Sequence, residues 1–314
     1  MSVFLGIDTS NYTTSTAIYD TDSQKIEQSK KLLPVKDGEL GLRQADAVFA
    51  HVKQLGDVTE RLFLSGGHMI SAVGASFRPR DVDGSYMPCF MVGETAARVA
   101  AAAMGVPLYR FSHQAGHVAA ALYSAGRLDL MDKRFIAFHL SGGTTEGLLV
   151  EPSDEYVLRC TKVAGSLDLK AGQAVDRVGA LLGLAFPAGA ELEKLAEKSE
   201  VRFKIKATMK GENCCLSGIE NRCEDMLKNG ASPCDVAKRC LCEIEAALVG
   251  MTRELLAAYG DLPLVYAGGV MSNAMIRGDI EREFGGLFAE PQFSSDNAAG
   301  IAVLAARRSA ERGA

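Results

Sequence analysis

Apolar and polar positions follow the same pattern at the start of each half of the chain. Residues 3–20 read VFLGIDTSNYTTSTAIYD, which is an apolar strand, a polar turn rich in Ser and Thr, and a second strand. Residues 134–151 read RFIAFHLSGGTTEGLLVE and repeat this hairpin pattern. A shift of 131 positions places Phe4 on Phe135, Ser10 on Ser141, Thr13 on Thr144 and Thr14 on Thr145. The repeated pattern predicts an internal duplication.

Helical and strand patterns alternate between and after the two hairpins. In the first half we expect a helix over 51–67, a strand over 70–76, a helix over 93–105 that ends at Gly105, and a strand over 106–111. An alanine-rich helix with two histidines follows. In the second half we expect helices over 174–184, 190–199 and within 212–258, and a strand over 262–270. A closing helix begins at Ser294, Ser295 and Asp296.

No low-complexity linker separates the halves, so the pattern predicts one α/β unit of two lobes with a cleft between them. We expect residues 1–130 to form the first lobe, which carries the two-histidine helix. Residues 131–314 form the second lobe, which carries the repeated turn and the closing helix.

Composition and charge narrow the class of protein. The 314 residues are 47% hydrophobic with a mean hydropathy of +0.05, which is typical of a soluble globular protein. No stretch has the roughly 20 apolar residues that span a bilayer. Asp8 interrupts the first apolar run, which predicts a strand instead of a signal peptide. We therefore expect a cytoplasmic protein without membrane contact. A net charge of −5 means that any RNA contact needs a local basic patch or a partner.

The eight cysteines carry no predicted site. In the cytosol we expect them to stay reduced. Six of them lie within residues 214–242 without a Cys-x-x-Cys pair, which favours small buried hydrophobic side chains over a metal cluster.

Three turns at strand ends are candidates for binding phosphate, namely Asp8–Ser15, Ser141–Thr145 and Gly268–Gly269. Glycine lets backbone N–H groups approach a phosphate closely, and hydroxyl groups donate further hydrogen bonds. Each turn alone is explained by hairpin geometry. Three such turns, two of them related by the repeat, favour a nucleotide held between the lobes.

His113 and His117 lie four residues apart in the alanine-rich helix. Residues i and i+4 share a helix face, so both imidazoles can reach one metal ion. The spacing is common by chance, and without a third ligand it favours packed or surface histidines.

Together these segments resemble the catalytic subunit of tRNA threonylcarbamoyladenosine synthase, formerly the glycoprotease family, in the actin–hexokinase superfamily of two-lobed ATPases. HQAGH is similar to the family's His-x-x-x-His motif, and LSGGTT to its Ser-Gly-Gly-His-Thr turn. AGQAVDRVGALLGLAFPAG, LVYAGGVMSNAMIR and SSDNAA resemble three further family segments in the same order. The resemblance covers nearly the whole chain and implies a duplicated, ribonuclease-H-like fold.

The resemblance implies a metal site and a nucleotide site. It supplies Asp296 as a third ligand beside His113 and His117, a set that suits iron or zinc better than magnesium. Asp176 would accept hydrogen bonds from a ribose, and Asn273 would bind the base or ribose. From the residues alone, helix capping for Asp176 and turn geometry for the glycines are the favoured explanations. The implied substrate- and nucleotide-binding residues are His139, Leu140, Ser141, Gly142, Gly143, Thr144, Thr145, Asp176, Gly189, Gly268, Gly269 and Asn273, with Asp8 and Ser10 in the first turn.

The implied activity is acyl transfer. A partner enzyme makes threonylcarbamoyl-adenylate, and this family, with partner subunits, moves the threonylcarbamoyl group to N6 of adenosine 37 in tRNA. The metal would polarise the carbamoyl carbonyl or hold the adenylate. No Ser–His or Cys–His nucleophile is needed, so we do not expect a protease, and we assign no catalytic residue.

Several positions depart from the family pattern. Where the family has an acidic pair in its first turn, this chain has Tyr12 and Thr13. Thr144 replaces a histidine, Gln173 a glutamate and Glu220 a lysine. Residues 78–83 are also more charged than the family's Gly-Pro-Gly-Leu. The alternative is therefore a divergent metal- and nucleotide-binding paralogue with another carbamoyl transfer or an ATPase activity; a partner-binding subunit without enzymatic activity comes third.

Overall fold

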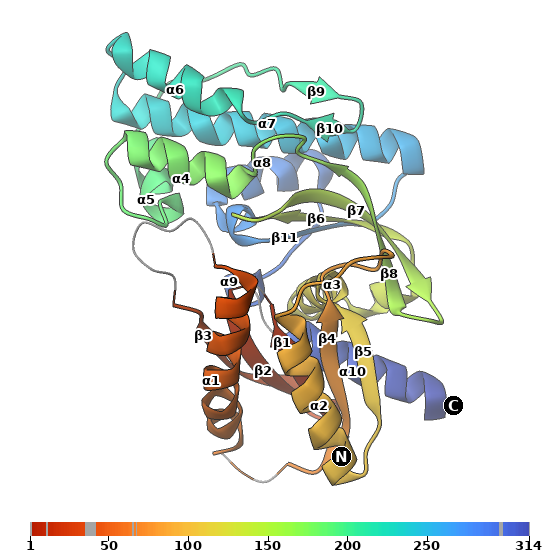
Figure 1. Ribbon diagram of the computed structural model, residues 1–314. Coiled ribbons are helices and arrows are strands. Elements are labelled where there is room, and N and C mark those ends of the chain that lie inside the picture. The colour runs from red at the N-terminus through yellow and green to blue at the C-terminus, as the bar shows by residue number, and fades with distance from the viewer. Residues whose placement is uncertain are drawn as a thin grey trace. The chain divides into compact units, whose positions relative to one another are not determined.

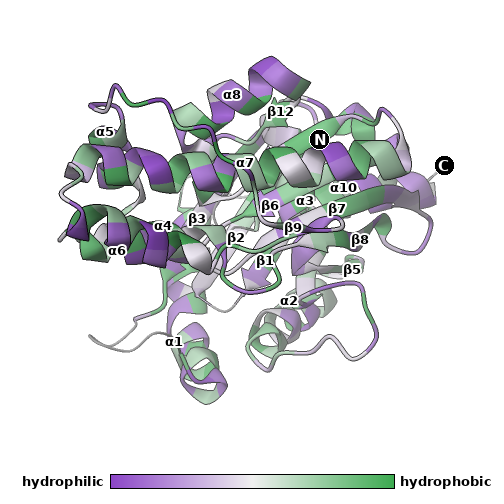
Figure 2. Cartoon of the chain, turned by 90° about the horizontal axis from the view of Figure 1, so that it is seen from above, coloured by the Kyte–Doolittle hydropathy of each residue, from purple (hydrophilic) through white to green (hydrophobic). Residues whose placement is uncertain are grey.

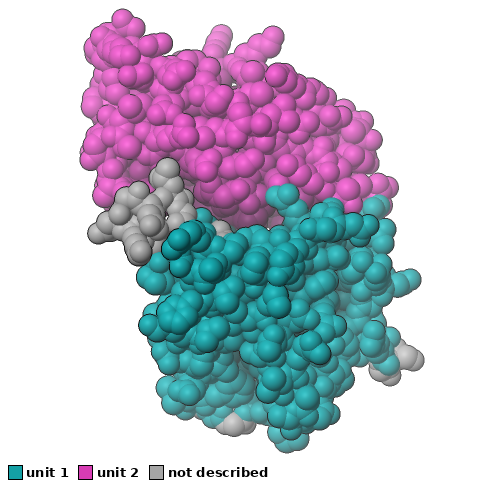
Figure 3. All heavy atoms as spheres, in the orientation of Figure 1, with its two compact units in different colours: residues 1–133, 151–160, 292–314 teal, residues 134–150, 161–291 magenta. Residues whose placement is uncertain are grey.

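The fold is that of a computed structural model, which describes residues 2–10, 12–34, 42–64, 66, 68–294 and 298–313. The chain forms two compact units, which Figure 3 shows in two colours. Unit 1 comprises residues 1–133, 151–160 and 292–314, and unit 2 comprises residues 134–150 and 161–291. Residues 292–314, which the division of the sequence places in the second lobe, are therefore part of unit 1.

Unit 1 is built on a five-stranded sheet with the strand order β3-β2-β1-β4-β5 (Figure 1). Strands β1 to β3 form an antiparallel meander, and β4 and β5 run parallel to β1. The strands are β1 (Val3–Thr9), β2 (Thr13–Asp20), β3 (Lys25–Leu32), β4 (Ile70–Arg78) and β5 (Leu108–Ser112).

Helices cover both faces of this sheet. Successive residues of β1 point to opposite sides, so Gly6 and Thr9 lie on opposite faces. A Cβ on Gly6 would lie 2.5 Å from the carbonyl oxygen of Ala298, so β1 meets the start of α10 there. On the other face, a Cβ on Gly93 of α2 would lie 2.8 Å from Thr9 Oγ1. The helices of unit 1 are α1 (Gln44–Phe63), α2 (Phe90–Met104), α3 (His113–Ser124), the 3₁₀ helix η1 (Leu128–Asp132) and α10 (Ala299–Gly313), with the short α9 (Pro291–Ser294) at the unit boundary.

Unit 2 repeats this topology. Its sheet has the order β12-β11-β6-β7-β8, which matches that of unit 1 when read from the other end. The strands are β6 (Phe135–Leu140), β7 (Thr145–Ser153), β8 (Val157–Gly165), β11 (Leu264–Ala267) and β12 (Leu287–Phe288). The pair Thr9–Thr14 in the first hairpin becomes Leu140–Thr145 in the second after a shift of 131 positions. The expected α/β fold and internal duplication are confirmed.

A large helical layer accompanies the second sheet. Its elements are α4 (Ala171–Leu181), α5 (Gly189–Ala196), α6 (Gly218–Lys228), α7 (Pro233–Tyr259) and α8 (Ala274–Phe284), with β9 (Met209–Lys210), β10 (Asn213–Cys214) and the 3₁₀ helix η2 (Gly269–Ser272). In the sheet, the Tyr266 ring stacks between Phe138 and Phe288, with ring centroids 5.3 and 5.0 Å away. Figure 2 shows β6 in hydrophobic colours, whereas α8 carries hydrophilic ones. Apolar side chains of the sheet and of the helices are buried together, among them Ile136, Leu248 and Tyr266, and their burial is the main stabilising contribution of the unit.

All eight cysteines are free thiols in this structure. Among the described helices, none combines the length and the apolar composition that crossing a membrane requires.

Candidate metal and nucleotide sites

The two histidines of α3 point at one another. Helix α3 follows directly on β5, and the Ser112 hydroxyl caps it by accepting a hydrogen bond from the Ala115 N–H at 3.1 Å. One turn separates His113 from His117, and their Nε2 atoms lie 2.9 Å apart. Zinc-imidazole bonds of about 2.0–2.1 Å place two ligating nitrogens of one ion roughly 3 Å apart. The observed separation therefore fits two ligands of a single ion.

Asp8, at the end of β1, holds the His113 ring. Its Oδ1 atom lies 3.0 Å from His113 Nδ1, and the carboxylate is fully buried. A carboxylate at Nδ1 keeps the proton there and turns the Nε2 lone pair toward a metal. The second oxygen, Oδ2, is buried without a hydrogen-bond partner. Burial, together with the charge of Asp8, raises the pKa of the neighbouring Cys89 thiol to about 11.

The third expected ligand, Asp296, lies outside the described residues. Within the described part of the chain, no three His, Cys, Asp or Glu side chains are grouped to hold a metal ion. The nearest described residue after it, Ala298, lies against Gly6, two positions before Asp8 in β1. The described residues thus supply two imidazole nitrogens and a carboxylate that orients one of them, which is compatible with part of a zinc or iron site and does not complete one.

The turn Ser141–Thr145 joins β6 to β7 and packs against the start of α4. Within the turn, the Ser141 N–H donates to the Thr144 carbonyl at 2.7 Å, and the Thr144 N–H donates to Ser141 Oγ at 3.1 Å. The Thr145 hydroxyl accepts from the Ala171 N–H at 2.8 Å, which anchors the helix. Gly142 and Gly143 are exposed, and a Cβ on either would have no atom within 4 Å. Their N–H groups donate to no partner in the described chain, so they are free for an anion.

Gly268 links β11 to η2 and packs against the end of β6. Its φ of +99° suits only glycine, and a Cβ there would collide with the Leu140 carbonyl and lie 2.8 Å from the His139 ring. Gly269 instead has open space around it. Because β6 and β11 run parallel, their carboxyl ends bring both turns to one edge of the sheet, where ligands of α/β proteins bind.

The remaining predicted residues lie around α4, α5 and α8. Asp176 Oδ1 accepts from the Ala188 N–H at 3.0 Å, which fixes the turn before α5 and its first residue, Gly189. Asn273 caps α8 by accepting from the Ile276 N–H at 3.0 Å. Both thus have local structural roles, and each keeps a second polar atom without a hydrogen bond in the described chain. The geometry is compatible with a nucleotide and does not by itself require one.

Asp168, which the sequence analysis did not single out, lies in the segment that joins β8 to α4. Its carboxylate accepts from the Leu216 N–H at 2.7 Å and the Ser217 hydroxyl at 2.6 Å, and so ties the segment before α6 to the segment before α4. Burial opposes the change, yet these hydrogen bonds lower the pKa of Asp168 below its usual range. The only sequence signal was an aspartate three residues before α4.

Two of the departures from the family pattern have local partners. Glu220 forms an ion pair with Arg177 of α4 at 2.9 Å. Gln173 accepts from the Lys170 N–H at 3.2 Å and so caps α4. The side chains therefore serve the packing of α4 in this chain.

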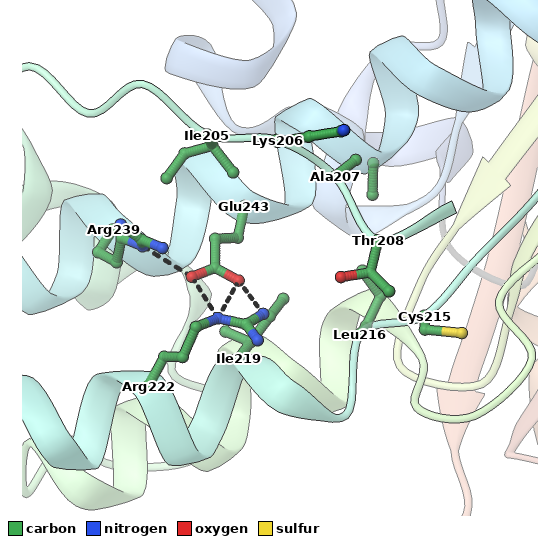
Figure 4. Close-up of a pocket in the computed structure, with 11 residues that line it drawn as sticks. Ile205, Lys206, Ala207, Thr208, Cys215, Leu216, Ile219, Arg222, Arg239 and Glu243 are labelled. Carbon is green, nitrogen blue, oxygen red and sulfur yellow. Dashed lines mark hydrogen bonds and ion pairs between the residues drawn. The ribbon is translucent and has the colours of Figure 1, made fainter. Parts of the chain in front are cut away.

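A separate cavity of about 150 Å³ lies in unit 2 and contains none of the predicted residues (Figure 4). Glu243 of α7 is 5% exposed and accepts hydrogen bonds from Arg222 and Arg239. This carboxylate neutralises part of the arginine charge on the cavity wall.

Comparison of the sequence with known proteins identifies related chains. The family model for tRNA N6-adenosine threonylcarbamoyltransferase matches residues 50–303. A protein of that name from Methanococcoides burtonii is 28% identical, over 96% of this chain and 88% of its own length. One from Thermus thermophilus is 29% identical, over 97% of this chain and 92% of its own length. A probable bifunctional tRNA threonylcarbamoyladenosine biosynthesis protein from Thermoplasma acidophilum is 27% identical, over 96% of this chain and 55% of its own length.

Solved structures share the fold. Component A of the (R)-2-hydroxyglutaryl-CoA dehydratase of Acidaminococcus fermentans matches with a TM-score of 0.60 and 17% identity, over 99% of this chain and 100% of its own. A ROK family glucokinase from Streptomyces griseus matches with a TM-score of 0.52 and 18% identity, over 98% and 100%. The actin–hexokinase-like fold expected from the sequence is thereby confirmed.

Proposed function

The chain belongs to the tRNA N6-adenosine threonylcarbamoyltransferase family, and we propose that it transfers a threonylcarbamoyl group from threonylcarbamoyl-adenylate to N6 of adenosine 37 in tRNA. The observation that carries the proposal is the family match over residues 50–303, which includes α3 and the turn Ser141–Thr145. We further propose partner subunits and a separate enzyme that forms the adenylate.

His113 and His117 would hold one zinc or iron ion, with Asp296 as the third ligand. The convergence of the two Nε2 atoms and the carboxylate behind His113 support this. When bound, the ion supplies Lewis-acid stabilisation of the charge that develops on the carbamoyl oxygen or on the phosphate. Asp8 would keep His113 in the tautomer that ligates.

The turn Ser141–Thr145 would bind the phosphate of the adenylate. The free N–H groups of Gly142 and Gly143 can donate to phosphate oxygens, and the start of α4 adds a favourable dipole. Asp176, Gly189, Gly268, Gly269 and Asn273 would surround the nucleoside. These contacts position the acyl group, and no protein nucleophile takes part.

The test is a transfer assay with tRNA that lacks the modification. The chain is supplied with a threonylcarbamoyl-adenylate-forming enzyme, threonine, bicarbonate, ATP and the partner subunits, and the nucleosides are analysed by mass spectrometry. We expect modified adenosine with the wild-type chain and its loss with His113→Ala. Absence of product with intact nucleotide binding would contradict the proposal.

A second candidate is another carbamoyl transfer or slow ATP hydrolysis. The specific observation in its favour is that Thr144 stands where the family has a histidine and that Glu220, in place of a lysine, pairs with Arg177. Loss of an acid–base group costs about 10²–10⁴ in rate, whereas binding through backbone contacts persists. Phosphate release without tRNA modification in the same assay would favour this candidate.

A further inference from the structure

The segment that follows β4 is folded onto the first turn of α3. The Gln114 N–H donates to the Pro79 carbonyl at 3.0 Å. The Ser112 hydroxyl donates to Asp81 Oδ2 at 2.9 Å and, in turn, accepts from the Ala115 N–H at 3.1 Å. The segment thus accepts one N–H group at the start of the helix directly, and it holds the Ser112 hydroxyl that accepts a second one.

Asp81 is held firmly in this position. Its side chain is 1% exposed, and its other oxygen accepts from Arg78 Nη2 at 3.1 Å. The Arg78 guanidinium lies over two aromatic rings, at 4.8 Å from the Phe77 centroid and 5.2 Å from that of Tyr156. Both oxygens of a buried carboxylate are therefore paired, which leaves the group little freedom.

His113 is the first residue of α3, so its place depends on how that first turn is fixed. His117 is one turn further in, where the helical hydrogen bonds hold it. We infer that Asp81, held by Arg78, is a positioning residue that sets His113 against His117 and Asp8.

The inference concerns the geometry of the histidine pair, and its consequence for metal affinity rests on the function proposed above. Asp81→Asn keeps the shape of the side chain but removes the charge that holds Arg78. Ser112→Ala removes the link to the helix and leaves the Arg78–Asp81 pair in place. Glu243→Gln is a matched control, because it also breaks a buried carboxylate–arginine pair, but in unit 2.

The first measurement uses metal-free protein labelled with ¹⁵N-histidine. The chain has five histidines, and His51, His68 and His139 serve as internal references. We expect Asp81→Asn and Ser112→Ala to move the imidazole signals of His113 relative to these references, and Glu243→Gln to leave them in place. Unchanged His113 signals in both variants would overturn the inference.

The second measurement is titration with Co²⁺ against a chelator, followed by the visible spectrum at saturation. We expect Asp81→Asn to weaken Co²⁺ binding by about 10–100-fold and to shift the spectrum, as loss of outer-shell support does. Glu243→Gln should lower the melting temperature without either effect. Wild-type affinity and spectrum in Asp81→Asn would contradict the inference. Failure of the wild-type chain to bind Co²⁺ would instead contradict the proposed metal site, and the histidine signals alone would then test the role of Asp81.

Discussion

Asp8 and His113 are 105 positions apart in the sequence, yet their side chains meet at 3.0 Å. The spacing of His113 and His117 could be read from the helical pattern, because i and i+4 residues share a face. The carboxylate behind them could not, because it depends on the pairing of β1 with β4 and on the position of α3. Local periodicity predicts which residues share an element, and tertiary packing decides which elements meet.

We predict that the purified chain carries about one transition-metal ion per protomer. His113→Ala removes a direct ligand and should abolish occupancy, since the ligands left hold a labile ion poorly. Asp8→Asn leaves the ligands but weakens the orientation of His113, so affinity should fall by about 10–100-fold. Elemental analysis and chelator competition measure both. His68→Ala is the matched control, and full occupancy in His113→Ala would exclude this site.

A second prediction concerns the buried His51 of α1. Its Nδ1 lies 2.8 Å from the Thr14 hydroxyl, and burial lowers the pKa of His51 below the usual value of about 6.5. The unfolded chain therefore binds a proton more readily than the folded chain, so stability falls as pH drops below about 6.5.

His51→Gln keeps a partner for Thr14 and cannot titrate. Urea unfolding of the wild type and of this variant, at pH 7.5 and 5.5, isolates the contribution. We expect a smaller loss of stability at pH 5.5 in His51→Gln than in the wild type. Equal losses would show that His51 does not titrate in this range.

At the scale of elements, the turn between β6 and β7 offers a clean test of nucleotide binding. Gly142 has open space around it, so Gly142→Val should fold normally while its branched side chain blocks approach to the backbone. Loss of one or two charge-assisted hydrogen bonds corresponds to roughly 10–100-fold weaker ATP or ADP binding in calorimetry. Gly56→Val, in equally open space on α1, should bind like the wild type. Unchanged affinity in Gly142→Val would show that the phosphate does not bind at this turn.

Helices α3 and α10 cross with almost no space between their backbones. A Cβ on Gly300 would collide with the carbonyl of Gly116, which lies between the two histidines in α3. Gly300→Ala should therefore lower the free energy of unfolding by about 1–3 kcal/mol. Gly278→Ala, in α8 with free space, should instead raise it by up to about 1 kcal/mol. Denaturant unfolding measures both, and equal effects would contradict this close crossing.

Helices and strands differ in how well their own sequences predict them. The end of α2 at Gly105 was predictable, because its φ of +68° suits glycine at a helix end. Strand β3 was not, because KIEQSKKL is largely exposed and charged and becomes a strand only by pairing with β2. Strand β8 was likewise not predicted, because it forms by pairing with β7. Edge strands with one exposed face carry little apolar signal.

At the scale of the whole molecule, a net charge of −5 opposes binding of a polyanion. We predict that the chain alone binds tRNA weakly at physiological salt and that the partner subunits supply most of the affinity. Fluorescence anisotropy with labelled tRNA, with and without the partners, measures this difference. Tight binding by the chain alone would require a basic surface that its composition does not suggest.

The division of the chain between the units also has a consequence for its synthesis. Unit 2 is encoded within residues 134–291, whereas unit 1 needs residues 292–313 to place α10 against β1, β4 and α3. On the ribosome, unit 2 can therefore fold while the first 133 residues still lack the helix that covers one face of their sheet. His113 and His117 are synthesised early, but the helix that packs against α3 is synthesised last. A nascent chain stalled before residue 292 should expose the α3 face to proteases and chaperones, and release of the final segment should protect it.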